Sequence, residues 1–554
     1  MGALVLTCLL IGQVTWSKAF EVNAATDTAY SVVYDPADNA FVVVGHISNG
    51  PIGGLDILVL KVTADSGKII WAKAYGIPAD DYARDIVLIP DEDNPTRNNY
   101  VVVGYDVADR NADVVAFMLD NSGNLIWNGI YSTAAPDRSE YVYAVAVASD
   151  GLILVGKVEP GPIGDSFGLP DSSDGLAIKL ALSNGGVIWS RVYTKALLGT
   201  ELLPGLCFYD VIMASDSVFV TTGEDIYLDD SSDVAAMLGH SSNGASVTTI
   251  RNYKFPSALY SSGRAIVPSL TTSGYAIIGN LSGTSNRAFL LEVSDSLLPS
   301  WARSYSFNAY IDAFDVVQYR HGTALDYVLT GSVSPGTAGS FDSYIMSVSA
   351  NGIPNWARAL GGCGGSMTLA DFSTHLIYVQ SLSSFVSVGY TAWPSSWTQD
   401  NMLVIKTDTL GSILCPSQDS CMYSISVTAN EAMPDTMTSC EEQEISLNVT
   451  PLNELDVIES DTLICAEWPS GVIESGCSYP IMTTLKVNGF TVTVPFGGQS
   501  FRLEVIDMAG RTIHTEDGRI GQREFDLPVR AAGVYMLRVT SEKGESFRKI
   551  VIFR

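Results

Sequence analysis

The stretch GKIIWAKAY at residues 67–75 decides the fold, because its pattern occurs in seven copies along the chain. Most copies are a turn and a short apolar strand ending in Trp, with a basic residue two places later and an aromatic residue four places later. The key positions are Trp16, Trp71, Trp127, Trp189, Thr249 in a degenerate copy, Trp301 and Trp356. Successive positions lie 52 to 62 residues apart, which indicates an array of like structural units.

Each unit is β rather than α, because three more segments of alternating or continuous apolar character follow the Trp strand. After Trp16 come DTAYSVVYD at residues 27–35, the run FVVVG ending at Gly45, and DILVLKV at residues 56–62. The apolar run ends in glycine in every copy, at Gly45, Gly104, Gly156, Gly223, Gly279, Gly331 and Gly389. Each unit therefore supplies four strands.

Seven four-stranded sheets bury little surface separately, but packed face to face around an axis they share a continuous core and keep only short edges. We therefore expect an all-β chain with a seven-bladed β-propeller over residues 14–412. The Trp, with about 150 to 250 Å² to bury, is expected to wedge between neighbouring blades. The repeated glycine is expected at a turn or a close backbone approach.

The repeat of Gly, apolar residues, Trp, basic and aromatic residues, Asp-x-Ala and an apolar run ending in Gly resembles the SBBP or delta-60 repeats of bacterial extracellular propellers. The resemblance covers about 390 residues. It implies a propeller fold outside the cell, but it does not imply an activity, because one fold hosts unrelated functions.

Sixty acidic against 31 basic residues give the chain a formal charge of -29. Nucleic-acid binding is excluded, because phosphate contacts need clustered Lys and Arg. The excess of acidic residues favours a well-solvated surface. The alternative interpretation is that acidic loops bind calcium. The candidate ligands are Asp91, Asp93, Asp171, Asp174, Asp229, Asp230 and Asp233. None of these loops matches the EF-hand spacing or an RTX array, so we assign no metal or cofactor site.

Residues 1–13 have the length of the apolar core of a signal peptide, without a basic start or a clear cleavage site. They also resemble the strand that precedes Trp in later copies. We expect the remnant of an export signal there. No other stretch reaches the 18 or so apolar residues of a membrane helix, so no transmembrane segment is expected in the mature chain.

Residues 413–480 are expected to form a linker or mini-domain held by disulfides. Five of the eight cysteines lie there, namely Cys415, Cys421, Cys440, Cys465 and Cys477. Small exported segments often need such bridges, and the spacing does not suit zinc. An odd number leaves at least one thiol without a partner in the segment. Cys207 and Cys363 are expected to be buried small hydrophobes.

Residues 481–554 alternate apolar and polar residues between glycine turns, as a small antiparallel β-sandwich does. VIDMAGR at residues 505–511, the passage with Gly533, Val534 and Tyr535, and the ending RKIVIFR resemble the type A C-terminal sorting domain of the Bacteroidetes type IX secretion system. The resemblance implies the secretion machinery as a partner, export across the outer membrane and removal of the tail.

No catalytic constellation is visible. The five histidines, His46, His240, His321, His375 and His514, are scattered, and each is expected to be packed or exposed rather than a general base. Nucleophile-elbow, phosphate-loop and zinc-protease motifs are missing from the sequence. Carboxylates could converge in the tunnel of the ring, but the sequence does not say which.

We expect a secreted or cell-surface protein that binds a glycan, a matrix component or another surface protein through loops on one face of the ring. No catalytic, cofactor or metal residue is assigned. The alternatives are an extracellular carbohydrate-active enzyme, either hydrolase or lyase, with tunnel carboxylates, and a calcium-stiffened adhesin.

Overall fold

The computed structural model describes residues 15–413 apart from internal gaps, and the residues of the strands between 422 and 552. The longest gaps are 161–172, 195–204, 241–248 and 361–370. In this part of the chain all regular structure is β, apart from one short 3-10 turn, η1 (Gln380–Leu382). The expectation of an all-β chain is confirmed. The expected export signal at residues 1–13 lies outside the described residues.

The strands up to Thr407 form seven groups of neighbouring antiparallel strands, numbered here in chain order. Group 1 contains β2 (Asp27–Asp35), β3 (Ala40–Ser48), β4 (Leu55–Thr63) and β5 (Ile69–Gly76). Group 2 contains β6 (Asp80–Pro90), β7 (Asn98–Ala108), β8 (Asn111–Leu119) and β9 (Leu125–Thr133). Group 3 contains β10 (Arg138–Ala148), β11 (Gly151–Pro160), β12 (Asp174–Leu180) and β13 (Val187–Thr194). Group 4 contains β14 (Gly205–Ser215), β15 (Val218–Ile226), β16 (Ser232–His240) and β17 (Thr249–Lys254).

The remaining groups complete the set. Group 5 contains β18 (Tyr260–Pro268), β19 (Tyr275–Ser282), β20 (Arg287–Val293) and β21 (Pro299–Ser306). Group 6 contains β22 (Tyr310–Ile311), β23 (Asp315–His321), β24 (Ala324–Ser334), β25 (Asp342–Ser349) and β26 (Pro354–Leu360). Group 7 contains β27 (Asp371–Val379), β28 (Ser384–Ser396), β29 (Gln399–Thr407) and β1 (Trp16–Val22). The first Trp strand of the chain therefore completes the last group, with Ala19 opposite Leu403.

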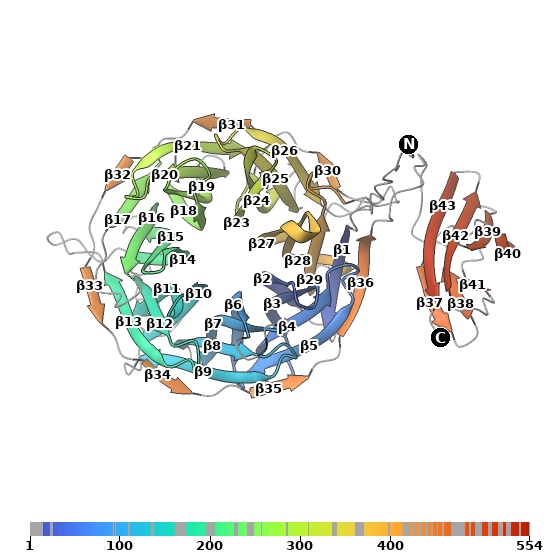
Figure 1. Ribbon diagram of the computed structural model, residues 1–554, viewed down its shortest axis with the longest axis horizontal. Helices are drawn as coiled ribbons and strands as arrows, with labels where there is room; N and C mark the ends of the chain where they lie inside the picture. Colours follow the sequence, from blue (N-terminus) through green and yellow to red (C-terminus); the bar gives the residue numbers. More distant parts are fainter. Residues whose placement is uncertain are drawn as a thin grey trace, which may run out of the picture.

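The groups are arranged around a common axis (Figure 1). Their first strands, β2, β6, β10, β14, β18, β23 and β27, lie innermost, and the Trp strands lie outermost. The first strand of each group contacts the first strand of the next, and β27 contacts β2. Groups 4 and 5 are joined into one ten-stranded sheet by the single pair Ser232 and Tyr260. None of the sheets among the described strands closes on itself.

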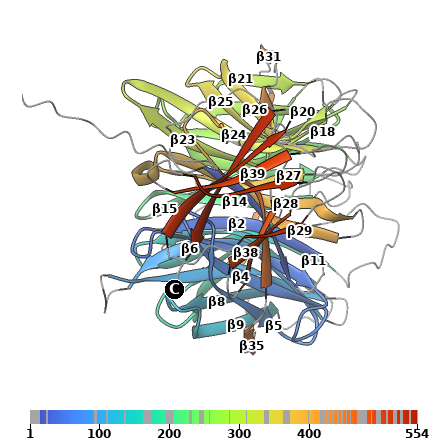
Figure 2. The same ribbon diagram turned by 90° about the vertical axis from the view of Figure 1, so that its right-hand side faces the viewer.

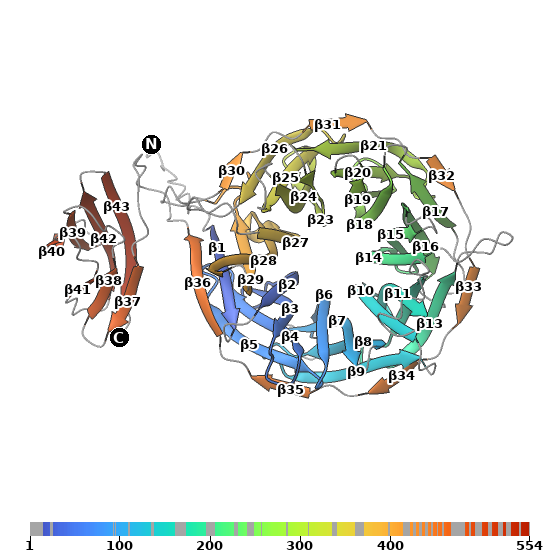
Figure 3. The ribbon, with the colours of Figure 1, turned by 180° about the vertical axis from the view of Figure 1, so that it is seen from behind.

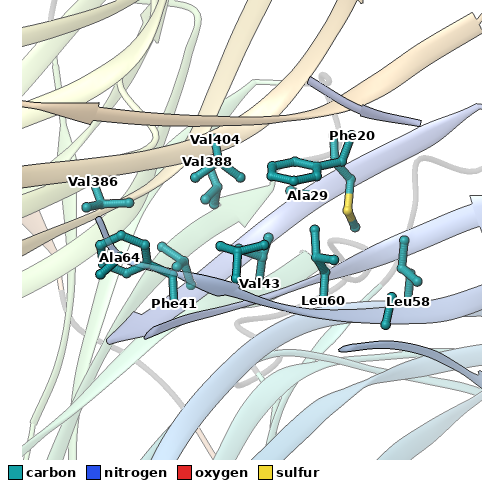
Figure 4. Packing of buried hydrophobic residues seen from close by; sticks show 14 of the residues in the cluster. Phe20, Ala29, Phe41, Val43, Leu58, Leu60, Ala64, Val386, Val388 and Val404 are labelled. Atoms are coloured by element: carbon teal, nitrogen blue, oxygen red, sulfur yellow. The ribbon is translucent and has the colours of Figure 1, made fainter. Parts of the chain in front are cut away.

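The hydrophobic core is divided among the interfaces between groups. A separate cluster of buried residues lies at each of the seven interfaces. At the interface between groups 7 and 1, Val386, Val388 and Val404 face Phe41 and Val43 (Figure 4). Burying such a side chain contributes about 1.5 to 3 kcal/mol, so packing between groups is the main stabilising force.

In most groups the Trp of the outermost strand packs on the last turn of the next group. The Nε1–H of Trp71 donates to the carbonyl of Asn121 (3.2 Å), and the hydroxyl of Tyr75 donates to the carbonyl of Gly123 (2.6 Å). Gly123 has a φ of 77°, which L side chains rarely adopt, and a Cβ there would lie 3.1 Å from the Trp71 ring. Trp, basic residue and Tyr are two apart, so they share one face of the strand.

The same arrangement recurs around the ring. Trp16 donates to Ala64, Trp127 to Leu182, Tyr131 to Gly185, Tyr253 to Leu297 and Tyr305 to Gly352. The basic residues take part, since Lys73 donates to Asn124 Oδ1 and Arg303 to the carbonyl of Asn351. The expectation that Trp wedges between neighbouring units is confirmed at these positions. The structure adds that the Trp strand is the last strand of its sheet, not the first.

Within the expected linker at residues 413–480, the described strands between residues 422 and 466 pair with the ring instead of forming a separate module. Seven short strands run from β30 to β36, and each pairs antiparallel with the outermost strand of a different group. Their bounds are β30 (Met422–Ser424), β31 (Thr428–Glu431), β32 (Asp435–Met437), β33 (Glu441–Glu444), β34 (Leu447–Thr450), β35 (Asn453–Asp456) and β36 (Glu459–Ala466). They pair in order with β26, β21, β17, β13, β9, β5 and β1.

These seven strands, the belt, thus follow the outside of the ring in the direction opposite to the groups (Figure 1, orange). The belt explains why the segment carries no alternating pattern of its own, because its strands are only three to eight residues long and depend on pairing with a neighbour. Cys465 lies in β36 opposite Ser17. The other four cysteines of the segment lie outside the described residues, so the disulfides stay a prediction.

The tail forms two antiparallel sheets. One contains β37 (Met482–Lys486), β38 (Gly489–Thr493) and β41 (Glu524–Leu527). The other contains β39 (Phe501–Asp507), β40 (Thr512–Gly518), β42 (Gly533–Ser541) and β43 (Gly544–Ile552). None of these strands pairs with a described strand of the ring. Figures 1 and 3 show both sheets beside the ring, on the side of β36, and in Figure 2 the same sheets lie in front of the ring.

Candidate functional site

A β-bulge interrupts the innermost strand of most groups at the same point. In β6 the register shifts between Ala83 and Asp85, so Arg84 is the extra residue. The partner residue is Gly104, where a Cβ would lie 1.8 Å from the carbonyl oxygen of Tyr82. Only glycine fits this contact, which confirms the expected close backbone approach. The glycine lies inside its strand rather than at the strand's end, because β7 continues to Ala108.

The bulge brings one residue from each of several groups together. The guanidinium carbon of Arg84 lies 4.4 Å from the ring centroid of Tyr30 and 5.7 Å from that of Tyr143. The rings of Tyr143 and Tyr209 are 5.4 Å apart, and Arg264 lies 4.3 Å over Tyr209. Tyr30, Arg84, Tyr143, Tyr209 and Arg264 therefore form a continuous row across groups 1 to 5, called here the axial arc. All five side chains are partly exposed.

Further aromatic rings surround the arc. Tyr82 stacks on Tyr105 with centroids 4.9 Å apart, and Tyr105 meets Tyr141 edge-on at the same distance. Arg84 donates a hydrogen bond to the hydroxyl of Tyr105 (2.5 Å). His46 lies 5.1 Å from Tyr82, centroid to centroid. Aromatic faces thus surround the guanidinium of Arg84, a combination that stacks on planar or ring-shaped ligands.

Arg84 carries a positive charge without a carboxylate partner at ion-pair distance among the described residues. Its Nε is buried and makes no hydrogen bond there. Burial, followed by the charge of Arg84, lowers the pKa of the neighbouring His46 to about 3, so this imidazole is neutral at physiological pH. Arg264 differs, because the nearby charges of Glu224 and Asp312 raise its pKa.

The residue that follows the bulge is a carboxylate in groups 2 and 4, and in group 6 a carboxylate, Asp315, begins the innermost strand β23. Asp85 accepts hydrogen bonds from the Ser31 hydroxyl (2.8 Å) in the previous group and from the Val145 N–H (2.9 Å) in the next. Asp210 accepts from the Ile266 N–H and Asp315 from the Leu376 N–H, both at 2.7 Å. Each carboxylate therefore links the innermost strands of two successive groups. The sequence did not identify these three residues.

Burial raises the pKa of all three carboxyl groups, that of Asp315 to about 7. In group 7 the same position holds His375, whose Nδ1 accepts the Val32 N–H (3.3 Å) and whose Nε2 lies 3.5 Å from Asp315 Oδ2. Burial lowers the pKa of His375. The neutral imidazole therefore serves as a backbone acceptor between groups 7 and 1.

The other candidate residues do not gather at this site. Asp174 is the first residue of β12, Asp233 lies in β16, and Asp91 accepts the Asn94 N–H in a turn. Asp93, Asp171, Asp229 and Asp230 lie outside the described residues. Within the described part of the chain, no three His, Cys, Asp or Glu residues are arranged to hold a metal ion.

The histidines and cysteines occupy different environments. His321 is the last residue of β23, and its Nε2 lies 2.9 Å from Asp326 Oδ2. His240 ends β16, and His514 lies in β40. Cys207 is a buried free thiol, as expected, and burial raises its pKa to about 12. Cys363 lies outside the described residues.

The axial arc was missed in the sequence because its residues differ between copies. What the five residues share is a place in the pairing, because each follows directly after the residue that pairs with the repeated glycine of its copy. They precede that glycine by 13 to 20 residues, because the hairpins differ in length, so aligning the sequence copies on the glycine does not place them in one column.

The ring and its tail define an all-β protein with a C-terminal module whose strands pair only among themselves. The family model described as the secretion system C-terminal sorting domain matches residues 487–553, so this part of the chain is such a domain. Sorting domains of this family direct export by the type IX secretion system, and the protein is therefore exported from the cell. No helix of the described residues is long and apolar enough to span a membrane.

No curated protein matches the chain with significance. Among solved structures, the extracellular domain of a putative hybrid two-component system from B. thetaiotaomicron is 8% identical, with a TM-score of 0.18 and coverage of 97% of this chain and 75% of that one. The tail fiber of Staphylococcus aureus phage P68 is 8% identical, with a TM-score of 0.15 and coverage of 62% and 95%. Scores this low do not establish a shared fold.

Proposed function

We propose that the chain is a secreted or cell-surface binding protein whose seven groups of strands are the blades of a seven-bladed β-propeller. Support comes from the contacts between successive groups, from the seven core clusters and from β1, which completes the last group. The sorting domain at residues 487–553 supports passage through the type IX machinery to the cell surface or the medium. The resemblance to SBBP repeats belongs to this proposal.

The observation that carries a binding role is the use of the axial carboxylates. Hydrolysis of a glycoside requires one carboxyl group that protonates the leaving group and a second that acts as nucleophile or base. Asp85, Asp210 and Asp315 instead direct their oxygens at backbone N–H groups of the same and the next blade. These contacts make them structural links and leave the aromatic arc as the surface for a ligand.

A rigid ring suits this role. The blades are held by backbone pairing, interface cores and side-chain links, so loops and arc residues keep their places without a ligand. The ligands that fit are a glycan, a matrix component or another surface protein. A glycan-array screen of the exported protein tests the proposal, and we expect binding of a defined set of glycans without their turnover.

The second candidate is an extracellular carbohydrate-active enzyme, favoured by Asp315 and His375. A carboxyl group with a pKa of about 7 is partly protonated near neutrality and can act as a general acid. If the protein degrades a polysaccharide and Asp315→Asn abolishes that activity, the function is catalysis rather than binding. For the calcium-stiffened adhesin, no observation on the described residues adds support.

Export is tested separately by deleting residues 487–553. We expect the shortened protein to remain inside the cell envelope, whereas the full chain reaches the surface or the medium. Equal export of both forms would contradict the role of the tail in this protein.

A further inference from the structure

We infer that Arg84 and the rings around it form a binding site for an acidic sugar, with the sugar carboxylate on the guanidinium. The inference rests on the proposed binding function and names the ligand class of the same surface. It starts from the charge of Arg84, with which no acidic side chain among the described residues pairs although the chain has a formal charge of -29.

The donors of Arg84 are largely unused. A guanidinium has five N–H donors in a planar fork, and one of them bonds the Tyr105 hydroxyl. The buried Nε–H has no partner among the described residues. A partly buried cation with free, fork-shaped donors matches a carboxylate, which accepts two parallel hydrogen bonds. His46 adds no competing charge, because it is neutral at physiological pH.

The aromatic residues favour a sugar as the carrier of that carboxylate. Tyr30 and Tyr143 flank Arg84, and Tyr209 continues the row. Tyrosine rings pack on the apolar face of a pyranose, and their hydroxyl groups can exchange hydrogen bonds with it. The partial exposure of the arc leaves these groups open to a ligand.

A peptide fits less well. Adding an extended peptide to a sheet requires free backbone N–H groups at an edge. At the innermost strands, Asp85 accepts the Val145 N–H, Asp210 accepts the Ile266 N–H and Asp315 accepts the Leu376 N–H. These groups are therefore already satisfied. A uronic acid needs side-chain contacts only, which the arc provides.

The test measures binding of tri-galacturonate to the full exported chain by calorimetry, beside its methyl ester and an Asp-Glu-Asp peptide. We expect the acid to bind, and the ester and the peptide to bind at least 10-fold more weakly. Arg84→Gln is expected to reduce affinity for the acid at least 10-fold, or about 1.4 kcal/mol. Arg320→Gln is the control, because this arginine is exposed near the end of β23 and lies outside the axial arc, and it is expected to stay within threefold.

Several results would overturn the inference. These are equal affinity for acid and ester, equal affinity for the peptide, an unchanged affinity in folded Arg84→Gln, or no binding of the acid at all. If Arg84→Gln does not fold, Arg84→Lys keeps the charge without the planar fork and is expected to weaken binding at least threefold, and an unchanged affinity would again contradict us. Glycan-array binding of neutral glycans would leave the proposed function intact while the acidic-sugar site failed.

Discussion

Gly104 shows why the inner edge of each group needs a residue without a Cβ. The glycines in this column differ in sequence context but share one contact, a backbone oxygen of the innermost strand within about 2 Å of the place where a Cβ would be. The contact allows the bulge that exposes Arg84 and its counterparts. Sequence reasoning found these glycines and their close approach, but not the bulge, because a bulge depends on the pairing of two strands.

Gly104→Ala is expected to destabilise the protein by more than about 2 kcal/mol, because the new methyl group would meet the Tyr82 carbonyl 1.8 Å away and backbone cannot move aside as a side chain can. Urea unfolding measures the loss. In the control Gly186→Ala the nearest atoms belong to the Asn184 side chain, so a change below about 1 kcal/mol is expected. Equal effects of the two substitutions would contradict the bulge contact.

Asp81 makes the stability of the ring depend on pH. Burial, with the charges of Asp106, Asp56 and Asp80, raises its pKa to about 8, and its Oδ1 has no partner among the described residues. The folded protein therefore keeps a proton that the unfolded chain releases near pH 4. The stability from this group is complete below pH 4 and is lost as the pH rises through 8.

Asp81→Asn is therefore expected to stabilise the protein at pH 8.5 by on the order of a few kcal/mol and by clearly less at pH 5, where only the first part of the loss has occurred. The amide oxygen can still accept the Ile77 N–H that Asp81 accepts now. Thermal unfolding of both proteins at the two pH values measures the difference. Comparing variant with parent removes the opposite contribution of His46, which is the same in both. A variant that is less stable at pH 8.5 would contradict a buried, protonated Asp81.

At the scale of elements, the Trp strands act as connectors. Trp, the basic residue and Tyr lie on one face and contact the last turn of the next group, which explains why the motif and the turn glycine repeat together. The sequence predicted these strands well because their period and turn residues are strong. It placed the Trp strand first in its unit, since the order of strands in a sheet is set by pairing and not by the chain.

Tyr131→Phe tests the connector directly. The hydroxyl of Tyr131 is buried and donates to the Gly185 carbonyl at 2.8 Å, so its loss leaves that carbonyl without this bond and should cost about 1 kcal/mol. Chemical denaturation measures the change. Tyr34→Phe is the control, because that hydroxyl bonds Asn39 at the exposed surface and its removal should have little effect. A larger loss in the control would contradict the assignment.

For the whole molecule, the belt is the feature that sequence reasoning could not anticipate. Its strands are short, and the paired residues lie far apart in the chain. The separation ranges from 62 residues, for Leu360 and Met422, to 450 residues, for Trp16 and Ala466. The cysteines suggested a compact module instead. The belt covers the outer edge of every group, and such edges otherwise invite pairing with other chains.

Hydrogen exchange tests the belt in the intact protein. Because the strands between 422 and 466 pair with the ring, their amides should exchange more slowly than those of an unfolded chain and faster than those of the buried second strands, such as β3 and β7. Mass spectrometry of peptides from both regions gives the comparison. Exchange of the belt at the unfolded rate would show that it does not hold the ring.

The central claim is that seven groups of strands close into one ring, which the type IX system exports and which offers an aromatic, cationic arc to a ligand. Electron microscopy of the exported protein tests closure most directly. We predict class averages of a closed ring with seven radial densities around one axis. An open arc or superhelix, or a ring with another number of densities, would contradict the account.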